Sequence, residues 1–338
     1  MRRNPTLHGA SDKKASGAHA ASNLLLGFTV FRPETVRFAE RAMQGRDLIV
    51  LEEPQTPGFS EMLAGELPVD EYVMLTDFEF PEYAKLQSSL LQKLHNQGAH
   101  IEQIHPWLDR LITVQEFFAS GKGPADVPKG SPEESVYLRE KVWTSALVNF
   151  YEASSKGDFD EMIEAVMAFA KMDALKINDI DRSRAESVAS YLRERPGFEN
   201  IYVECGAIHI DMIMFLRRRL QPSGPIRVVH LMEETCKPRF GRRRMLPPGD
   251  ILTFRYLLGK KRDVRMERLL SARAVVYNKL IRKDEMVGQD SATPHLEDEA
   301  LVIGLVSALD YDECKKLHPV IQSLSAKNAL EVVKKTMN

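Results

Sequence analysis

The stretch "IYVECGAIHIDMIMFL", from Ile201 to Leu216, contains the pattern that decides the fold. Its first part is a short apolar run typical of a buried strand, and its last part has the apolar spacing of a helix. Gly206 lies between the two parts, where the absence of a side chain allows a tight turn. His209 then falls in the first turn of the expected helix. A strand that leads directly into a helix is the repeating unit of proteins with parallel sheets.

The same order of strand and helix recurs along the chain between residues 23 and 232. Apolar segments with helical spacing alternate with short apolar runs that end at turn or acidic residues. The runs predict five strands: Asn23–Val30, Asp47–Pro54, Ala99–Pro106, Asn200–Gly206 and Ile226–Met232. The helices expected before the fourth strand include Glu133–Ser154, one that starts after Asp158, and Arg182–Arg195. The sequence therefore predicts an α/β fold with a mostly parallel sheet flanked by helices.

The remaining segments set the expected domain boundaries. Residues 1–22 are basic and small without apolar periodicity, so a disordered arm is expected there. The α/β domain is expected to span residues 23–248. Residues 249–338 show helical periodicity, and this all-helical C-terminal extension is expected to pack on the α/β domain. Otherwise apolar residues such as Val276 and Leu280 would be exposed.

Composition limits the classes of function. The chain has 338 residues, 43% of them hydrophobic, and a formal net charge of −2, which gives no general preference for nucleic acid or acidic membranes. No apolar run approaches the roughly 18–20 residues that span a bilayer. The three cysteines lie far apart, which indicates reduced thiols and predicts a cytoplasmic location without membrane association. An oligomer is compatible with these properties.

Functional side chains in such a fold are expected just beyond the carboxyl ends of strands. The second strand ends at Glu52 and Glu53, which are candidates for a base or a metal ligand. Only one of the two can face a given pocket, because side chains alternate along a strand. His105 follows the third strand, and Glu204 and Gly206 end the fourth. A structural role is the alternative at each position: a solvated loop for the acids, and packing for a histidine before a proline.

His209 is the best imidazole candidate for chemistry. The free amides at the start of a helix disfavour a positive charge, so a neutral imidazole is expected there. A neutral imidazole that faces a cleft is a good base or metal ligand.

The segment "VVHLMEETCKPRFGRRR" raises two further possibilities. His230, Glu233 and Cys236 have spacings that a metal site can use, but three unlike ligands without a fourth favour a structural role. The basic run Arg239–Arg244 is a candidate for phosphate or RNA binding, with a solvated loop as the alternative. No nucleic-acid-binding motif accompanies the run, so this function is not favoured.

Four stretches, taken in order, resemble the TraB/Tiki superfamily, which also includes the ChaN-like and erythromycin-esterase-like proteins. "RAESVASYL" and "NIYVECGAIHIDMI" are similar to the Arg-x4-Ala helix, strand and Gly-x-x-His turn of that family. "LLLGF" and "DLIVLEEP" resemble its first strand, which ends in glycine, and its second strand, which ends in glutamate. "LLQKLHNQGAHIEQIHPWLDRLITV" resembles its next helix–strand–helix segment. The resemblance covers about residues 23 to 232.

The resemblance implies a hydrolase whose cleft contains Glu52 or Glu53, together with Arg184 and His209. Gly206 and His209 match the family's second Gly-x-x-His motif. In such a hydrolase the glutamate and the histidine would activate water, with or without a divalent metal. The arginine would hold an anionic group of a small-molecule or peptide ligand.

The first Gly-x-x-His motif of the family is incomplete in this chain. It would start at Gly27, but Val30 stands in place of its histidine. Tiki-like members are similar to metal-dependent proteases that rely on this histidine. The alternative function is therefore a non-catalytic relative that keeps the pocket for a ligand or partner.

The parallel topology predicts where these residues meet. The carboxyl ends of parallel strands lie at one edge of the sheet, so Glu52 or Glu53 and His209 should share one pocket. Arg184 is expected to open the helix before the fourth strand, and the start of a crossover helix lies at that same edge. A surface salt bridge to Glu186 or Glu53 is the alternative for Arg184.

Overall fold

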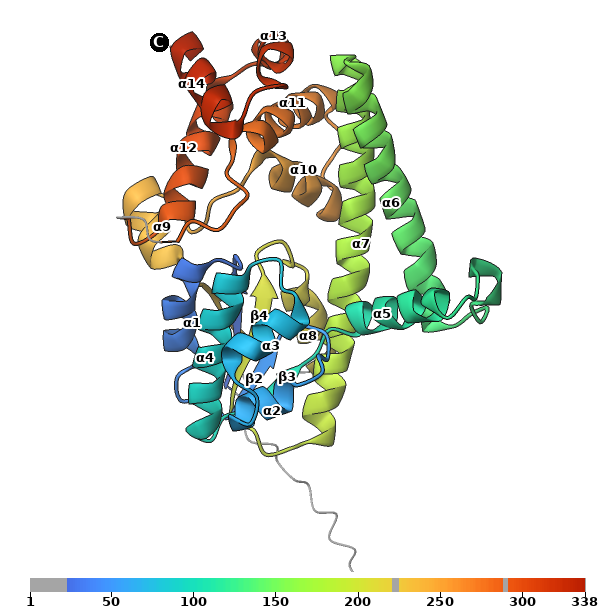
Figure 1. The fold of residues 1–338 in the computed structure, drawn as a ribbon, viewed down its shortest axis with the longest axis vertical. Helices are drawn as coiled ribbons and strands as arrows, with labels where there is room; N and C mark the ends of the chain where they lie inside the picture. The colour runs from blue at the N-terminus through green and yellow to red at the C-terminus, as the bar shows by residue number, and fades with distance from the viewer. Residues whose placement is uncertain (1–22, 221–224, 288–290, 338) are drawn as a thin grey trace, which may run out of the picture.

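Five parallel strands form one sheet in the order β3-β2-β4-β1-β5. The computed structural model describes residues 23–220, 225–287 and 291–337, and the arm expected at residues 1–22 lies outside them. The carboxyl ends of the strands point toward a layer of helices in the upper half of Figure 1. The predicted α/β fold with a parallel sheet is thus confirmed. The strands are β1 (Asn23–Thr29), β2 (Leu48–Leu51), β3 (His100–Gln103), β4 (Asn200–Gly206) and β5 (Arg227–His230).

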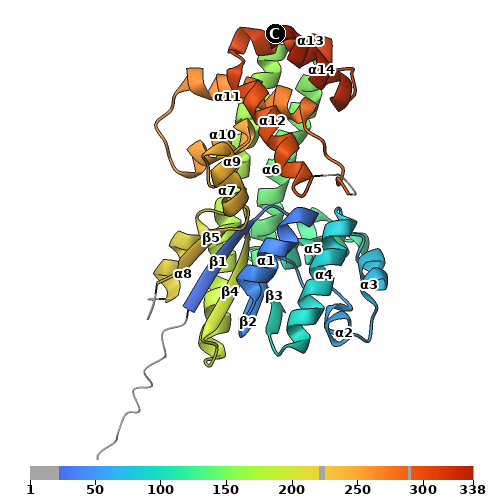
Figure 2. The same cartoon turned by 90° about the vertical axis from the view of Figure 1, so that its left-hand side faces the viewer.

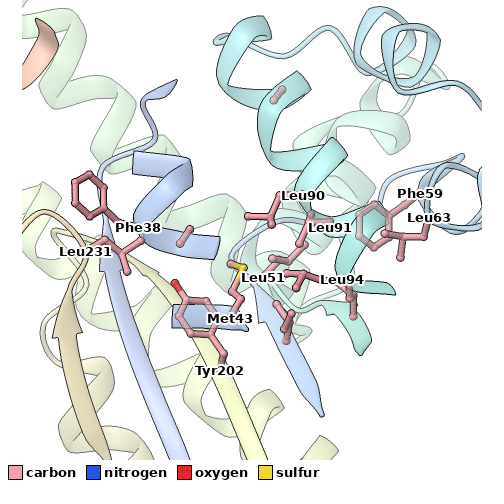
Figure 3. Packing of buried hydrophobic residues seen from close by; sticks show 14 of the residues in the cluster. Phe38, Met43, Leu51, Phe59, Leu63, Leu90, Leu91, Leu94, Tyr202 and Leu231 are labelled. Carbon is pink, nitrogen blue, oxygen red and sulfur yellow. The ribbon is translucent and has the colours of Figure 1, made fainter. Parts of the chain in front are cut away.

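Alternate side chains of the strands cover the two faces of the sheet. In β2, Ile49 and Leu51 pack on one face against α1–α4 (Figure 3), whereas Leu48 and Val50 pack on the other against α7 and α8. Both faces are therefore buried, as the continuous apolar runs of the strands require. The helices on the two faces are α1 (Val36–Met43), α2 (Phe59–Ala64), α3 (Val69–Thr76), α4 (Pro81–Asn96), α7 (Phe159–Glu194) and α8 (Met212–Leu220).

Helix α7 joins the sheet to the helical layer. It has 36 residues, a length of about 54 Å at the usual rise per residue. Ala185 and Val188 in its second half pack on the sheet, whereas Phe159 and Met162 in its first half pack on the C-terminal helices. The two helices that the sequence predicts in this region are one continuous helix, so Arg184 lies in its interior. The prediction that Arg184 opens a helix was wrong.

The helical layer combines the C-terminal helices with segments that lie before β4. In its core, Ile163 of α7 packs with Val276, Leu280, Val306 and Ile321. Helix α6 lies beside α7, so the two run together away from the sheet (Figures 1 and 2). The helical C-terminus is as predicted, but the layer also contains α6 and half of α7, which the sequence assigns to the α/β domain. The remaining elements are η1 (Pro33–Thr35), α5 (Pro106–Ala119), η2 (Pro124–Asp126), α6 (Pro132–Lys156), α9 (Glu233–Phe240), α10 (Pro248–Leu257), α11 (Val264–Leu280), α12 (Pro294–Ala308), α13 (Tyr311–Ile321) and α14 (Ala326–Met337).

A buried carboxylate ties the helical layer to the first strand–helix connection. Glu34 accepts hydrogen bonds from the backbone N–H groups of His295 and Leu296, at 3.0 and 3.2 Å, at the start of α12. Its second oxygen lies 2.5 Å from Nδ1 of His295. Burial alone would raise the pKa of Glu34, but the contacts with His295 outweigh it and lower the pKa. The carboxylate therefore caps α12 from the other layer.

Candidate active site at the carboxyl edge of the sheet

Two neighbouring strands and one helix bring the candidate residues together. Glu52 directly follows β2, and Gly206 is the last residue of β4, which lies beside β2. His209 lies in the turn after β4. Arg184 and Asp181 reach the same point from α7. The structure places these side chains and the backbone of Gly206 in one contiguous cluster.

Glu52 is the centre of this cluster. Its Oε2 accepts hydrogen bonds from Nη1 of Arg184, at 2.9 Å, and from the backbone N–H of Gly206, at 2.8 Å. Its Oε1 lies 3.2 Å from Nε2 of His209. Burial alone would raise the pKa of Glu52, but the charges of His209 and Arg184 outweigh it and hold the pKa below its usual value. Glu52 therefore accepts two hydrogen bonds, and the two charged neighbours around it favour the ionised form of its carboxyl group.

His209 lies between two carboxylates. Its Nδ1 is 2.5 Å from Oδ1 of Asp181, and its Nε2 faces Glu52. Burial alone would lower the pKa of His209, but the charge of Glu52 and the hydrogen bond to Asp181 raise it above its usual value. Helix α8 begins at Met212, so His209 precedes it and does not lie in its first turn. The helix dipole from which a neutral imidazole was expected is therefore not at this position, and two acids instead favour the protonated ring.

Asp181 is a site residue that the sequence does not single out. It is buried, and burial raises the pKa of its carboxyl group. The sequence feature that points to Asp181 is its distance from Arg184: it lies three residues earlier and therefore on the same face of α7. Its Oδ2 and the Nη2 of Arg184 have no hydrogen-bond partner among the described residues.

Arg184 is an interior ion of the fold. Only 2% of its side chain is exposed. Its Nε donates to the carbonyl oxygen of Ile104, at 2.9 Å, and its Nη1 contacts both Glu52 and Sγ of Cys205, the latter at 3.6 Å. It thus links the ends of β2 and β4 to the segment after β3. The alternative of a surface pair is wrong, because the partner of Arg184 is the buried Glu52.

Among the described residues, the carboxyl groups of Glu53 and Glu204 make no hydrogen bond or ion pair with Arg184 or His209. Glu53 accepts a hydrogen bond from Nε2 of Gln103, at 3.1 Å, and burial raises its pKa. Glu204 accepts from the backbone N–H of Glu52 and from Nε2 of Gln87, both at 3.3 Å. Burial, followed by the charge of Glu53, raises the pKa of Glu204 to about 8. Of the two adjacent acids after β2, the structure therefore brings only Glu52 to Arg184 and His209.

The two candidate glycines each make room for a neighbouring side chain. A Cβ atom on Gly27 would lie 2.2 Å from the hydroxyl oxygen of Tyr202, which is fully buried. A Cβ atom on Gly206 would lie 3.1 Å from Oε1 of Glu52 and 3.3 Å from Cδ2 of His209. Gly27 therefore serves packing in the sheet, whereas Gly206 allows the site residues to approach the backbone.

His105 caps a helix near the cluster. Its Nδ1 accepts a hydrogen bond from the backbone N–H of Leu108, at 3.2 Å, at the start of α5. Burial is the main reason that its pKa falls to about 4, so the ring is neutral at physiological pH. The hydrogen bond to Leu108 gives His105 a structural role, and the nearby charge of Glu52 only partly offsets the fall in its pKa.

A cavity of about 390 Å³ opens above Glu52 and His209. Its lower wall contains these two residues and Gly206, and its upper wall comes from the helical layer. The upper wall includes Asp250 of α10 and Glu299 of α12. The volume suits a small molecule or a few residues of a peptide.

The residues present do not fit the divalent metal that the sequence leaves open. Both ring nitrogens of His209 are engaged by carboxylates, and Val30, in place of the missing histidine, is itself part of the cavity wall. In the described ranges, no group of three His, Cys, Asp or Glu side chains is arranged to hold a metal ion. His230, which the sequence offers as a metal ligand with Glu233 and Cys236, belongs to no such group, and its ring stacks on Phe28.

The basic run Arg239–Arg244 is mostly exposed, but three of its arginines have partners within the protein. Arg239 pairs with Glu297, and Arg243 pairs with Glu233. Arg244 donates to the carbonyl oxygen of Ala207 beside the cavity.

None of the helices that the structure describes is long and apolar enough to cross a membrane. An uncharacterized protein from Archaeoglobus fulgidus is 27% identical to this chain over 291 residues, which cover 86% of this chain and 96% of the archaeal protein. No family model and no solved structure matches the chain. The chain is thus similar, over most of its length, to one archaeal protein.

Proposed function

We propose that this chain is a hydrolase of the TraB/Tiki or erythromycin-esterase-like type, acting on an ester or amide bond of a small molecule or peptide. The observation that carries the proposal is the line of contacts from Asp181 through His209 to Glu52 at the floor of the cavity. A carboxylate that orients an imidazole, which in turn faces a second carboxylate, is an arrangement suited to moving protons.

The pKa directions assign the two roles. Glu52, whose pKa is held below its usual value, acts as the base that takes a proton from the attacking water. His209, whose pKa is raised, acts in its protonated form as the acid and gives its Nε2 proton to the leaving oxygen or nitrogen. The water oxygen bonds to the acyl carbon while the bond to the leaving group breaks. Proton transfer from Glu52 to His209, across 3.2 Å, then restores the resting charges.

Asp181 and Arg184 act through these two groups. Asp181 engages Nδ1 of His209, so proton exchange is confined to Nε2. Arg184 does not line the cavity and contacts Glu52 from behind. We therefore assign Arg184 to holding Glu52 in its ionised form, in place of the anion-binding role that the family resemblance implies.

A non-catalytic binding protein is the second candidate. The observations that favour it are Val30 at the position of the family's first histidine and the contacts that already occupy Glu52, which are two hydrogen bonds and the ion pair with His209. In that case the cavity would retain a ligand without converting it.

Two adjacent glutamates provide a matched test. Hydrolysis of a panel of chromogenic esters and peptide amides would be measured for the wild type, Glu52→Gln and Glu53→Gln, with and without a chelator. We expect Glu52→Gln to lower kcat about a hundredfold or more, because it removes the base. Glu53→Gln, which lies outside the cavity wall, should stay within a few-fold of wild type. Ligands that raise the melting temperature without any turnover would favour the binding protein.

A further inference from the structure

Three helices of the helical layer place polar groups over the cavity. Asp250 comes from α10, Tyr277 from α11 and Glu299 from α12. The side chain of Asp250 makes no hydrogen bond or ion pair with any residue that the structure describes. Glu299 accepts one long hydrogen bond, 3.4 Å, from the hydroxyl of Tyr277. Two partly buried carboxyl groups thus face one space without a cation within ion-pair distance.

Nearby arginines offset only part of the charge on these carboxyl groups: Arg244 lowers the pKa of Asp250 and Arg32 lowers that of Glu299, but burial and neighbouring acids outweigh both. Arg244 stacks on Phe254 and donates to a backbone carbonyl, and Arg32 stacks on Phe80. Burial, and then the charge of Asp173 on α7, raises the pKa of Asp250 to about 6. Burial, and then the charge of Asp250, raises the pKa of Glu299 to about 7. A positive charge placed between the two would relieve this repulsion.

The other walls of the cavity suit an organic cation. Aromatic rings line it, and the face of an aromatic ring attracts ammonium and guanidinium groups. A bare metal ion is disfavoured, because the described residues offer no set of three metal-ligating groups. The rings are Phe28, Phe31, Phe80 and Tyr277.

We propose that the substrate carries an ammonium or guanidinium group that binds between Asp250 and Glu299, with its scissile bond at Glu52 and His209. This inference rests on the proposed function and specifies its substrate class. The upper wall of the cavity selects the substrate, and the lower wall converts it.

Arginine and citrulline derivatives test the inference, because the two side chains have nearly the same shape and differ in charge. Binding of Nα-acetyl-arginine amide and Nα-acetyl-citrulline amide would be measured by calorimetry, and hydrolysis would be measured with the two ethyl esters. We expect the arginine compounds to be favoured at least about tenfold, a difference of about 1.4 kcal/mol. Asp250→Asn and Glu299→Gln should each reduce this ratio toward one.

Glu297→Gln is the matched control, because Glu297 lies on α12 but outside the cavity wall and pairs with Arg239. This variant should keep the wild-type ratio. Equal binding of the two amides, or no binding of either, would overturn the inference. A binding preference without hydrolysis of either ester would leave the inference standing and count against the proposed hydrolase. Hydrolysis of both esters at equal rates would support the proposed hydrolase and count against the inferred preference for a cationic substrate.

Discussion

At the residue scale, the site is a set of buried ionisable groups that contact one another. Glu52 and Asp181 supply two carboxyl groups, Arg184 supplies a guanidinium group, and His209 supplies an imidazole. A buried charge is tolerated only with a partner, so each member of the set depends on the others. This dependence explains why the cluster lies at the junction of two strands and a helix, where all four side chains are fixed by packing.

Arg184→Ala should unfold the protein more easily. Arg184 is almost fully buried and pairs with the buried Glu52. Its loss leaves Glu52 without one of its two charged partners, and breaking a buried pair in this way costs about 3–5 kcal/mol. Urea unfolding would measure the free energy, with the exposed Arg193→Ala on the same helix as the control. Equal stability of the two variants would show that Glu52 does not need Arg184.

Glu204→Gln should flatten the pH dependence of stability. The pKa of Glu204 is raised to about 8 in the folded protein, so the folded state binds this proton more tightly than the unfolded chain does. The free energy of unfolding therefore falls as pH rises from about 4.5, the usual glutamate pKa, to about 8. Glutamine keeps an acceptor for the backbone N–H of Glu52 and removes the titration. Unfolding at pH 5 and pH 8 should show a smaller difference for the variant; an unchanged difference would place the titration elsewhere.

At the scale of elements, helix α7 packs against both layers of the molecule. Its apolar face packs on the sheet in one half and on the helical layer in the other. Its polar run "NDIDRSR" looks like a break between two helices, because Asn, Asp and Ser favour helix ends and turns. In the structure this run is helical, and its polarity supplies Asp181 and Arg184 to the site. The misassigned boundary and the missed residue therefore have the same cause.

Gly27→Ala should disturb the pairing of β1 and β4. The new Cβ atom would overlap the ring of Tyr202, which is fully buried and cannot move aside. Overpacking of this kind typically costs about 1–3 kcal/mol. In Gly304→Ala, the control on α12, the Cβ atom meets no atom within 4 Å, and the change should stabilise the helix by up to about 1 kcal/mol. Calorimetric melting would compare the two, and a wild-type melting temperature for Gly27→Ala would contradict the packing role.

At the scale of the whole molecule, the cavity belongs to neither layer alone. Its lower wall is the carboxyl edge of the sheet, and its upper wall is the helical layer. Figure 2 shows this layer beyond the carboxyl ends of the strands. Helix α7 and the contact of Glu34 with His295 hold the two layers together. The distance between the layers therefore sets the size of the cavity.

A chain truncated after Pro248 should aggregate. The truncation removes α11–α14 and all of α10 except its first residue, and it exposes the apolar face of α7 that contains Phe159, Met162 and Ile163. Light scattering and size-exclusion chromatography would detect the exposed surface. A soluble, cooperatively unfolding product would instead mean that the α/β part is independent of the helical layer.

The sequence predicts the sheet better than it predicts the site. Each strand is a continuous apolar run, which buried parallel strands require, so all five were predicted at nearly the observed positions. Glu52 and His209 were found because they follow strands. The choice between Glu52 and Glu53, and the charge of His209, depend on side chains from α7, which is distant in sequence. Asp250 and Glu299 face the site only because the helical layer packs over it, and no local pattern marks them.

The measurement that tests the central claim most directly is hydrolysis of the best ester by His209→Gln, with His100→Gln as the control. His100 lies at the start of β3, at the opposite edge of the sheet, and is exposed. The account predicts that His209→Gln lowers kcat about a hundredfold or more, because no acid remains for the leaving group, while the variant still unfolds cooperatively. His100→Gln should keep wild-type kcat. If His209→Gln keeps wild-type kcat while folded, His209 is not the acid and the account of this site is contradicted.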